Sequence, residues 1–230
     1  MADREILRPP PEIDNLPAPL ARYLRQLSQE INKIRSGTTF GFDDTTDYVE
    51  IEDDGTVRLY GDATSWVDIN IDLVQGALGA SAPDIGTIGG GTITHLLFDG
   101  VSTTEEISGH VELQHNIKFD VIKPHIHWTP ATTDAGNVKW NLTYSITNVG
   151  DADSETTISV VDAAGGAVES QVVGFGDIDV SSYGPGSQFS FRLFRDPTDG
   201  DDTYAHDAAT KTMGLHVEVQ SFGTRGVISE

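Results

Sequence analysis

The chain has 230 residues, of which 36 are Asp or Glu, 14 are Lys or Arg and none is Cys, so its formal net charge is −22. The lack of cysteine excludes disulfides, thiolate metal sites and cysteine nucleophiles. The excess negative charge repels phosphate backbones and anionic lipid headgroups, so we expect neither nucleic-acid nor membrane binding. We also expect a soluble protein without an export signal, because there is no long apolar run and the N-terminus lacks the apolar segment of a secretion signal.

The acidic residues are mostly aspartate, with 24 Asp against 12 Glu, and only 5 of the basic residues are Lys. An Asp-rich and Lys-poor surface suits high salt, because dissolved ions screen its self-repulsion. One interpretation is a marine or halophilic source. The other is an ordinary acidic surface that keeps a crowded assembly soluble.

The N-terminal region combines a proline-rich segment with a heptad pattern. Residues 1–19 contain five prolines and predict an extended docking arm. Apolar residues then recur at alternating steps of four and three, as in a coiled-coil seam: Leu20, Leu24, Leu27, Ile31 and Ile34. The pattern predicts an oligomerising helix over residues 20–36, with Pro19 in its first turn and Gly37 at its end. The alternative is an amphipathic helix docked on its own domain.

From residue 38 onward the apolar period changes to two, which is typical of β-strands. Residues 38–75 predict a small β region with a hairpin whose turn is Asp53-Asp54-Gly55. Residues 76–91 are small and Gly-rich and predict a linker or a long surface loop. Residues 92–230 contain about eight strand-like runs with one apolar and one polar face, which favours a jelly-roll β-sandwich. The predicted fold class is therefore all-β, a jelly-roll-like β-sandwich preceded by a short N-terminal heptad helix and a small β-hairpin region.

Two histidines, His125 and His127, share one face of a predicted strand and could bind the same metal. A His-x-His motif in a jelly roll suggests the cupin metalloenzymes, but Phe119 stands where that family has a glycine. The family's glutamate and the histidine of its second motif are also missing. Together with His110 and His216, the pair is better interpreted as interface residues or as a surface metal bridge. We therefore expect no catalytic metal and no cofactor.

One acidic loop is a candidate calcium site, and the known catalytic motifs are absent from the sequence. The loop contains Asp196, Asp199, Asp201 and Asp202, whose carboxylates could bind calcium. Their spacing does not match an EF-hand, so a solvated loop is favoured. The sequence contains no P-loop, no nucleophile elbow and no zinc-protease motif. We expect no catalytic residues and a protein that is not an enzyme.

Four stretches of the sequence form a recognisable set: GTVRLYGDATSWVDINIDL (55–73), EISGHVELQHNIKFDVIKPHIHWTP (106–130), NVKWNLTYSI (137–146) and GLHVEVQSFGTRG (214–226). Together they resemble virion structural proteins of tailed viruses of bacteria or archaea. From first to last they span about three-quarters of the chain. The resemblance implies a trimeric jelly-roll protein located in the virion and attached to capsid, neck or tail. No catalytic residues come with it.

The resulting functional prediction is a non-enzymatic virion structural protein. It would be a homotrimeric capsid decoration or cement protein, or a neck or tail appendage, with itself and other virion proteins (major capsid, neck or tail proteins) as partners. The alternative is a glycan-binding host-attachment protein, for which Trp66, Trp128, Trp140 and Tyr183 are candidate stacking platforms. Trp128 and Trp140 fall on apolar strand faces, which favours the core, whereas Tyr183 lies in a Gly/Pro loop. A cupin-like metal-binding protein is a third, weaker alternative.

Overall fold

The structure is a computed structural model that describes residues 17–35, 39–40, 46–52 and 55–222, without the side chains of residues 30–35 and 39–40. Most of the predicted proline-rich arm, Gly37 and the turn residues Asp53 and Asp54 lie outside the described residues. The chain divides into two compact units. The first consists of Met1–Ser65 with Val219–Val227, and the second consists of Trp66–Glu218 with Ile228–Glu230.

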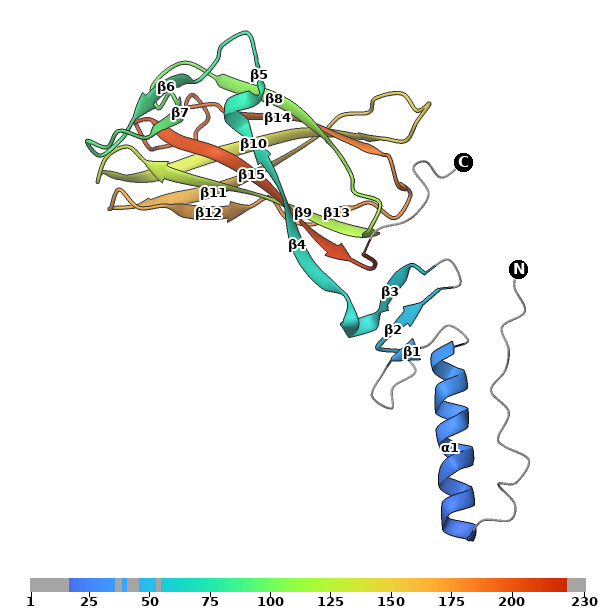
Figure 1. Cartoon of the computed structure of the whole chain (residues 1–230). Coiled ribbons are helices and arrows are strands. Elements are labelled where there is room, and N and C mark those ends of the chain that lie inside the picture. The colour runs from blue at the N-terminus through green and yellow to red at the C-terminus, as the bar shows by residue number, and fades with distance from the viewer. Residues whose placement is uncertain (1–16, 36–38, 41–45, 53–54, 223–230) are drawn as a thin grey trace. The chain divides into compact units, whose positions relative to one another are not determined.

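The described secondary structure is mostly strand and begins with a single α-helix (Figure 1). The elements are α1 (Ala18–Arg35), β1 (Thr39–Phe40), β2 (Tyr48–Ile51), β3 (Val57–Tyr60), η2 (Gly61–Ala63), β4 (Ser65–Asp72), η3 (Leu73–Gln75), β5 (Ala77–Leu78), β6 (Asp84–Thr87), β7 (Thr94–Phe98), β8 (Glu105–Glu112), β9 (Ile117–Pro130), β10 (Ala135–Thr147), β11 (Thr156–Gly165), β12 (Gln171–Gly174), β13 (Ile178–Asp179), β14 (Gln188–Arg195) and β15 (Ala208–Val219).

The first unit contains the predicted helix and the predicted hairpin. Helix α1 begins two residues earlier than predicted and carries Pro19 in its first turn. Proline fits there because the N–H groups of the first turn have no intrahelical acceptor, so the N–H that proline lacks is not needed. Strands β1, β2 and β3 form a three-stranded sheet. Tyr48 and Tyr60 pair across β2 and β3, and their stacked rings have centroids 4.4 Å apart. None of the described helices has the length and apolarity that crossing a membrane requires.

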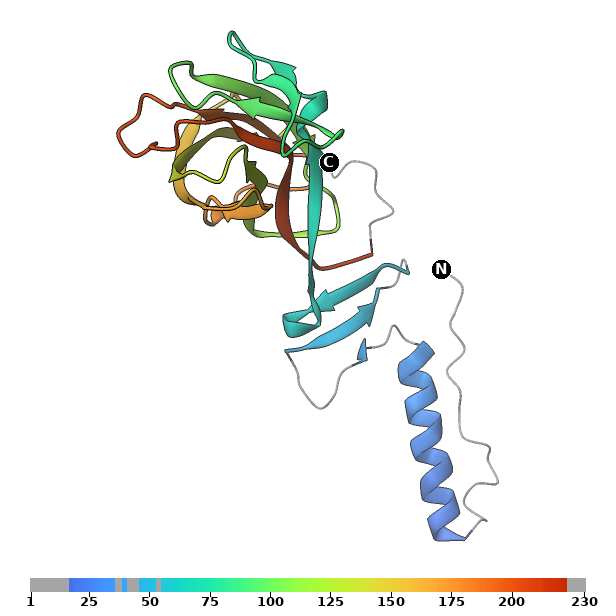
Figure 2. The same ribbon diagram turned by 90° about the vertical axis from the view of Figure 1, so that its left-hand side faces the viewer.

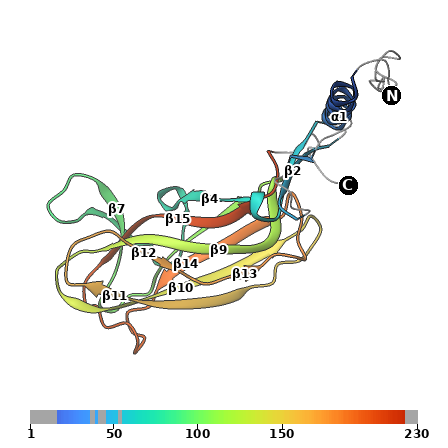
Figure 3. The same cartoon turned by 90° about the horizontal axis from the view of Figure 1, so that it is seen from below.

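The second unit is a jelly-roll-like β-sandwich, which confirms the predicted fold class. One sheet has the strand order β11-β10-β14-β8-β5, and the other has the order β12-β9-β15-β7-β6 with β13 on β9 and β4 on β15. Figure 2 looks along the strands, so that the two sheets are seen end-on. Figure 3 shows β13 beside β9 and β4 beside β15.

The core lies between the two sheets because every second side chain of their long strands faces inward. In β10, Trp140 and Leu142 are fully buried, and in β9 Ile126 and Trp128 are buried to the same degree. Both tryptophans therefore belong to the core, as their apolar strand faces predicted. Each buried aliphatic side chain of this kind contributes about 1.5–3 kcal/mol to folding.

The structure differs from the predicted boundaries around the linker. Residues 76–91, predicted as a linker, contain β5 and β6, which pair with β8 and β7. These edge strands have only two and four residues, too few for a period of two to be recognised. Strand β4, predicted as part of the small β region, pairs with β15 in the sandwich. Conversely, Ser221 bridges to Arg58, so the chain after β15 returns to the first unit.

Candidate functional site

The predicted histidine pair lies on the outward-facing side of β9. His125 is half-buried and His127 is exposed, and their rings meet edge to face with centroids 5.5 Å apart. His125 fits over Gly214, where a Cβ would lie 2.4 Å from the imidazole ring. Among the residues that the structure describes, no group of three or more His, Asp or Glu side chains is placed to hold a metal ion. The interface or metal-bridge role of this pair stays a prediction.

The other two predicted histidines do not join this pair. His216 on β15 hydrogen-bonds Asp68, with Nδ1 and Oδ1 2.8 Å apart, and its ring stacks on Trp66 with centroids 5.0 Å apart. Lys123 Nζ also lies 5.0 Å from the centroid of Trp66, so that indole ring is engaged by two neighbours. His110 lies on β8, in the other sheet. The last candidate platform, Tyr183, packs against the hydrophobic core.

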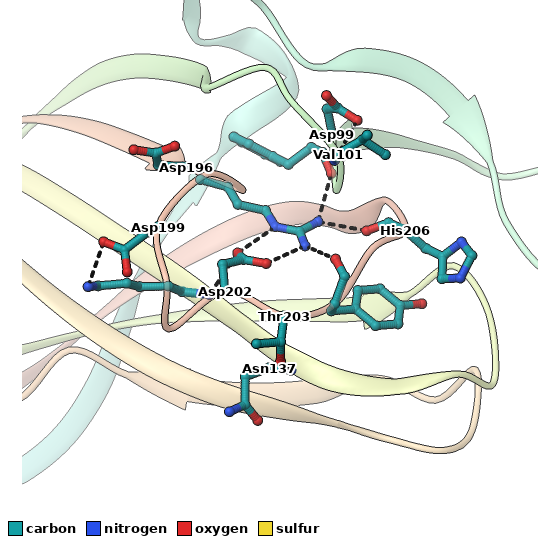
Figure 4. Close-up of polar contacts among 12 residues, drawn as sticks. Asp99, Val101, Asn137, Asp196, Asp199, Asp202, Thr203 and His206 are labelled. Atoms are coloured by element: carbon teal, nitrogen blue, oxygen red, sulfur yellow. Dashed lines mark hydrogen bonds and ion pairs between the residues drawn. The ribbon is translucent and has the colours of Figure 1, made fainter.

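The acidic loop folds around two basic side chains instead of forming an open carboxylate cluster (Figure 4). Asp202 accepts hydrogen bonds from Arg195 Nε and Nη2, both at 2.8 Å. Asp199 and Asp201 accept from Lys139 Nζ at 2.8 and 3.1 Å. The Lys139 hydrogen bond lowers the pKa of the Asp199 carboxyl. These three carboxylates are therefore committed to the protein's own cations, as the solvated-loop interpretation did not foresee.

Arg195, which no sequence pattern singled out, is the centre of this arrangement. Its side chain is fully buried. Beyond Asp202, its guanidinium donates to the backbone oxygens of Phe98 at 3.1 Å, His206 at 2.7 Å and Tyr204. A buried guanidinium cannot lose its proton, so it requires this complete set of acceptors. The Arg195 cluster, defined here as Arg195, Asp202 and these three carbonyl groups, is a structural element.

A second group of acids surrounds Glu105 at the start of β8. Burial, together with the negative charges of Asp99, Asp84 and Asp207, raises the pKa of Glu105 to about 7, although a hydrogen bond from the Asp99 backbone lowers it in part. That bond joins Asp99 N to Glu105 Oε2 at 2.6 Å. Burial also raises the pKa of Asp207. Glu105 therefore titrates near neutral pH.

A hollow lies on the outward-facing side of the five-stranded sheet, lined by Ser108, His110 and Ser190. Two adjoining hollows, of about 680 and 220 Å³, share Ser108, Ser190 and Phe191 in their linings. Together they are called the groove. Its floor follows the cross-strand register, in which Ser108 of β8 lies opposite Arg192 of β14, and Arg192 lies opposite Thr143 of β10. The groove thus crosses β5, β8, β14 and β10, a width of roughly 14 Å at the usual strand spacing.

Two segments form the walls of the groove. On one side the chain leaves β4 through η3 and enters β5, which brings Asn70, Asp72 and Gln75 into the lining. Gly76 permits this path, because a Cβ there would lie 2.7 Å from the Ile107 side chain and 2.9 Å from Ser108 O. On the other side, the loop between β10 and β11 contributes Asp153 and Glu155.

The lining of the groove contains both hydrogen-bond donors and acceptors. Arg192 is fixed by an ion pair with Glu106 and lies over Phe194, with the guanidinium carbon 4.2 Å from the ring centroid. The side chains of His110 and Glu155 have no hydrogen bond or ion pair with any residue that the structure describes. The groove therefore offers polar groups that the protein itself leaves available.

The sequence did not predict this groove, because its residues come from five separate segments. The period of two correctly indicated which side chains of β10 and β14 face outward. It could not indicate that β4 and the β10–β11 loop rise on either side of that face. Among the predicted site residues, only His110 lies in the groove lining.

Comparisons with known proteins give no family assignment. No protein-family model matches the chain, and no curated protein matches it. Solved structures with a similar sandwich include the CBM36-1 domain of a multidomain xylanase from the hindgut metagenome of Trinervitermes trinervoides, with 11% identity over 70% of this chain and 100% of that one, at a TM-score of 0.37. A carbohydrate-binding module CBM36 in complex with calcium and xylotriose has 12% identity over 64% and 98%, at a TM-score of 0.38. A protein of infectious bursal disease virus, Gx strain, has 10% identity over 78% and 40%, at a TM-score of 0.36.

Likenesses at this level carry no argument about what this chain binds. They also give no support to the tailed-virus origin that the sequence resemblance implies, so that origin stays a prediction. The groove and the exposed leucines of α1 are the features of the molecule that bear on its function.

Proposed function

We propose that the sandwich is a glycan-binding module that holds a stretch of polysaccharide in the groove and carries out no catalysis. The observation that carries this proposal is the continuity of the two hollows across β8, β14 and β10, lined by hydroxyl, amide, carboxylate and guanidinium groups. Glycan binding was the alternative function in the sequence analysis, but the groove is a different binding site from the aromatic residues considered there. None of the four aromatic residues nominated there lines the groove.

The chemistry of the lining favours a carbohydrate over other ligands. Each sugar hydroxyl both donates and accepts hydrogen bonds, so it can satisfy Asn70 and Gln75 as well as Glu155. An apolar ligand would bury these groups without partners, at a cost of about 1–3 kcal/mol for each. A nucleic acid would be repelled by a chain whose net charge is −22.

The proposal is tested by blocking the groove without touching the core. Ser190 is half-buried on the outward-facing side of β14 and lines both hollows. A glycan array and affinity electrophoresis with soluble polysaccharides should identify a ligand for the native protein, and Ser190→Trp should abolish its binding. The matched control is Val172→Trp, which adds a similar side chain at an exposed position of β12 in the other sheet and should bind normally. Binding that survives Ser190→Trp, or no glycan binding by the native protein, would refute the proposal.

Self-assembly through α1 is a second candidate function, favoured by a separate observation. In the described part of the predicted seam, Leu20 is 45% exposed and Leu27 is 41% exposed. Leu24 is half-buried, and the side chains of Ile31 and Ile34 lie outside the described residues. Exposed leucines at heptad spacing can pack against the same leucines on other copies of the helix, because knobs-into-holes packing requires this spacing on every partner. We therefore propose a parallel homotrimer, the form in which a virion structural protein would be built.

The prediction for this second candidate is that Leu27→Asp dissociates the oligomer. A helix of this length is marginal alone, so one charge in its seam should shift the mass measured by light scattering from trimer to monomer. The near-UV spectrum of the sandwich should not change. Gln26→Asp adds the same charge beside the seam and should remain trimeric. A native protein that is monomeric at micromolar concentration would contradict the proposal, and cryo-electron microscopy of particles would test the virion role.

A further inference from the structure

The charge of the groove restricts the class of glycan that it can accept, on the premise that the groove is a glycan site as proposed above. Three carboxylates line it, those of Asp72, Asp153 and Glu155. The guanidinium in the lining, that of Arg192, is already paired with Glu106. The lining therefore has an excess of negative charge within a chain that is itself strongly acidic.

These three carboxylates differ in how many hydrogen bonds they accept from the protein itself. Asp72 accepts from Val74 N at 3.1 Å and from Gln75 Nε2 at 2.9 Å. Asp153 accepts a single hydrogen bond, from Ser145 Oγ at 3.2 Å. Glu155 is exposed and accepts none from the residues that the structure describes. A ligand that enters at the β10–β11 loop therefore meets two charged oxygen groups with free acceptor capacity.

We infer that the groove selects uncharged, hydroxyl-rich glycans and excludes polyuronates and sulfated polysaccharides. A hydroxyl that donates to a carboxylate forms a charge-assisted bond, which is stronger than a bond between two neutral groups. A carboxylate or sulfate on the ligand would instead face a like charge at close range, and each such pair should weaken binding by roughly fivefold even in water. The positive charge of Arg192 does not offset this repulsion, because that charge is already neutralised by the ion pair with Glu106.

The inference is tested by affinity electrophoresis of the full chain in two sets of soluble polysaccharides. The neutral set is a mannan, a xylan and a mixed-linkage glucan, and the anionic set is polygalacturonate, alginate and dextran sulfate. At about 10 mM salt, where the screening length is ~30 Å, we expect retention by at least one neutral polysaccharide and by none of the anionic ones. Retention by an anionic polysaccharide that Ser190→Trp abolishes would overturn the inference and leave the proposed function standing. Retention by no polysaccharide would overturn both.

Two variants with equal charge separate the groove from the net charge of the chain. Asp153→Asn with Glu155→Gln neutralises the wall formed by the β10–β11 loop, and it should raise binding of polygalacturonate at low salt by roughly fivefold or more. The control is Glu169→Gln with Asp177→Asn, at exposed positions in the two loops that flank β12 in the other sheet. It changes the net charge equally and should leave polygalacturonate unbound. Equal gains in the two variants would show that overall charge, not the groove, excludes polyanions.

Discussion

The Arg195 cluster and the groove are built from the same kinds of polar residue, yet they differ in how those residues are satisfied. In the cluster, the charged groups of Arg195 and Asp202 are fully buried and bonded to each other and to backbone carbonyls. In the groove, His110 and Glu155 reach solvent and have no bonding partner among the described residues. The first arrangement fixes the fold, and the second leaves hydrogen-bonding capacity for a ligand.

Bonding within the protein therefore distinguishes the residues of the Arg195 cluster from those of the groove better than residue type does. The acidic loop looked like a candidate calcium site because it is rich in aspartate. Three of its four carboxylates, those of Asp199, Asp201 and Asp202, are instead bonded to Arg195 and Lys139. The groove contains no conspicuous motif, but its unpaired groups are the ones that lose least on binding a polar ligand.

The largest expected effect on the free energy of unfolding comes from removing the counter-ion of the Arg195 cluster. Asp202→Ala would leave the Arg195 guanidinium buried without its counter-ion, and we expect the free energy of unfolding to fall by about 3–5 kcal/mol. Urea denaturation followed by near-UV circular dichroism measures this change. Asp201→Ala, which removes only a more exposed contact to Lys139, should cost far less. If the two variants lost equal stability, the cluster would not be the structural element that its geometry indicates.

An intermediate effect is expected at Glu105, whose buried carboxylate accepts one hydrogen bond from the described part of the chain, that of Asp99 N. Its pKa in the folded protein is about 7, above the ordinary value of 4.5, so the folded state holds this proton more tightly than the unfolded chain. Its contribution to stability is therefore present below about pH 4.5 and is lost as the pH rises through 7. The loss is on the order of 3 kcal/mol, because each unit of pKa difference corresponds to about 1.4 kcal/mol.

The matching test is Glu105→Gln, which keeps an oxygen for the Asp99 N–H but cannot ionise. We expect the variant to be more stable than the native protein at pH 8, by on the order of 3 kcal/mol, and equal to it near pH 4.5. Urea midpoints at the two pH values measure the difference. Glu169→Gln, at an exposed position, should show no such dependence. A stabilisation that is the same at both pH values would assign the effect to something other than the titration of Glu105.

The sequence could predict the layers of this protein because periodicity is a local property. Alternation in residues 137–147 placed Trp140 in the core and Lys139 outside, as the structure shows. It could not predict Arg195, since a charged residue at an inward-facing position is recognised only with its acceptors, which come from residues 98, 202, 204 and 206. The groove could not be predicted for the same reason, because its floor depends on which strands become neighbours in the sheet.

The smallest effect on stability is expected at His110, and it is the sharpest test of the comparison. His110 is exposed and has no partner in the described part of the chain, so His110→Ala should change the free energy of unfolding by less than about 0.5 kcal/mol. A lost hydrogen bond to the glycan should nevertheless weaken binding by roughly three- to tenfold. His127→Ala, at an exposed position of the other sheet, should change neither quantity. A loss of stability at His110 without a loss of affinity would mean that the groove, like the Arg195 cluster, serves the fold alone.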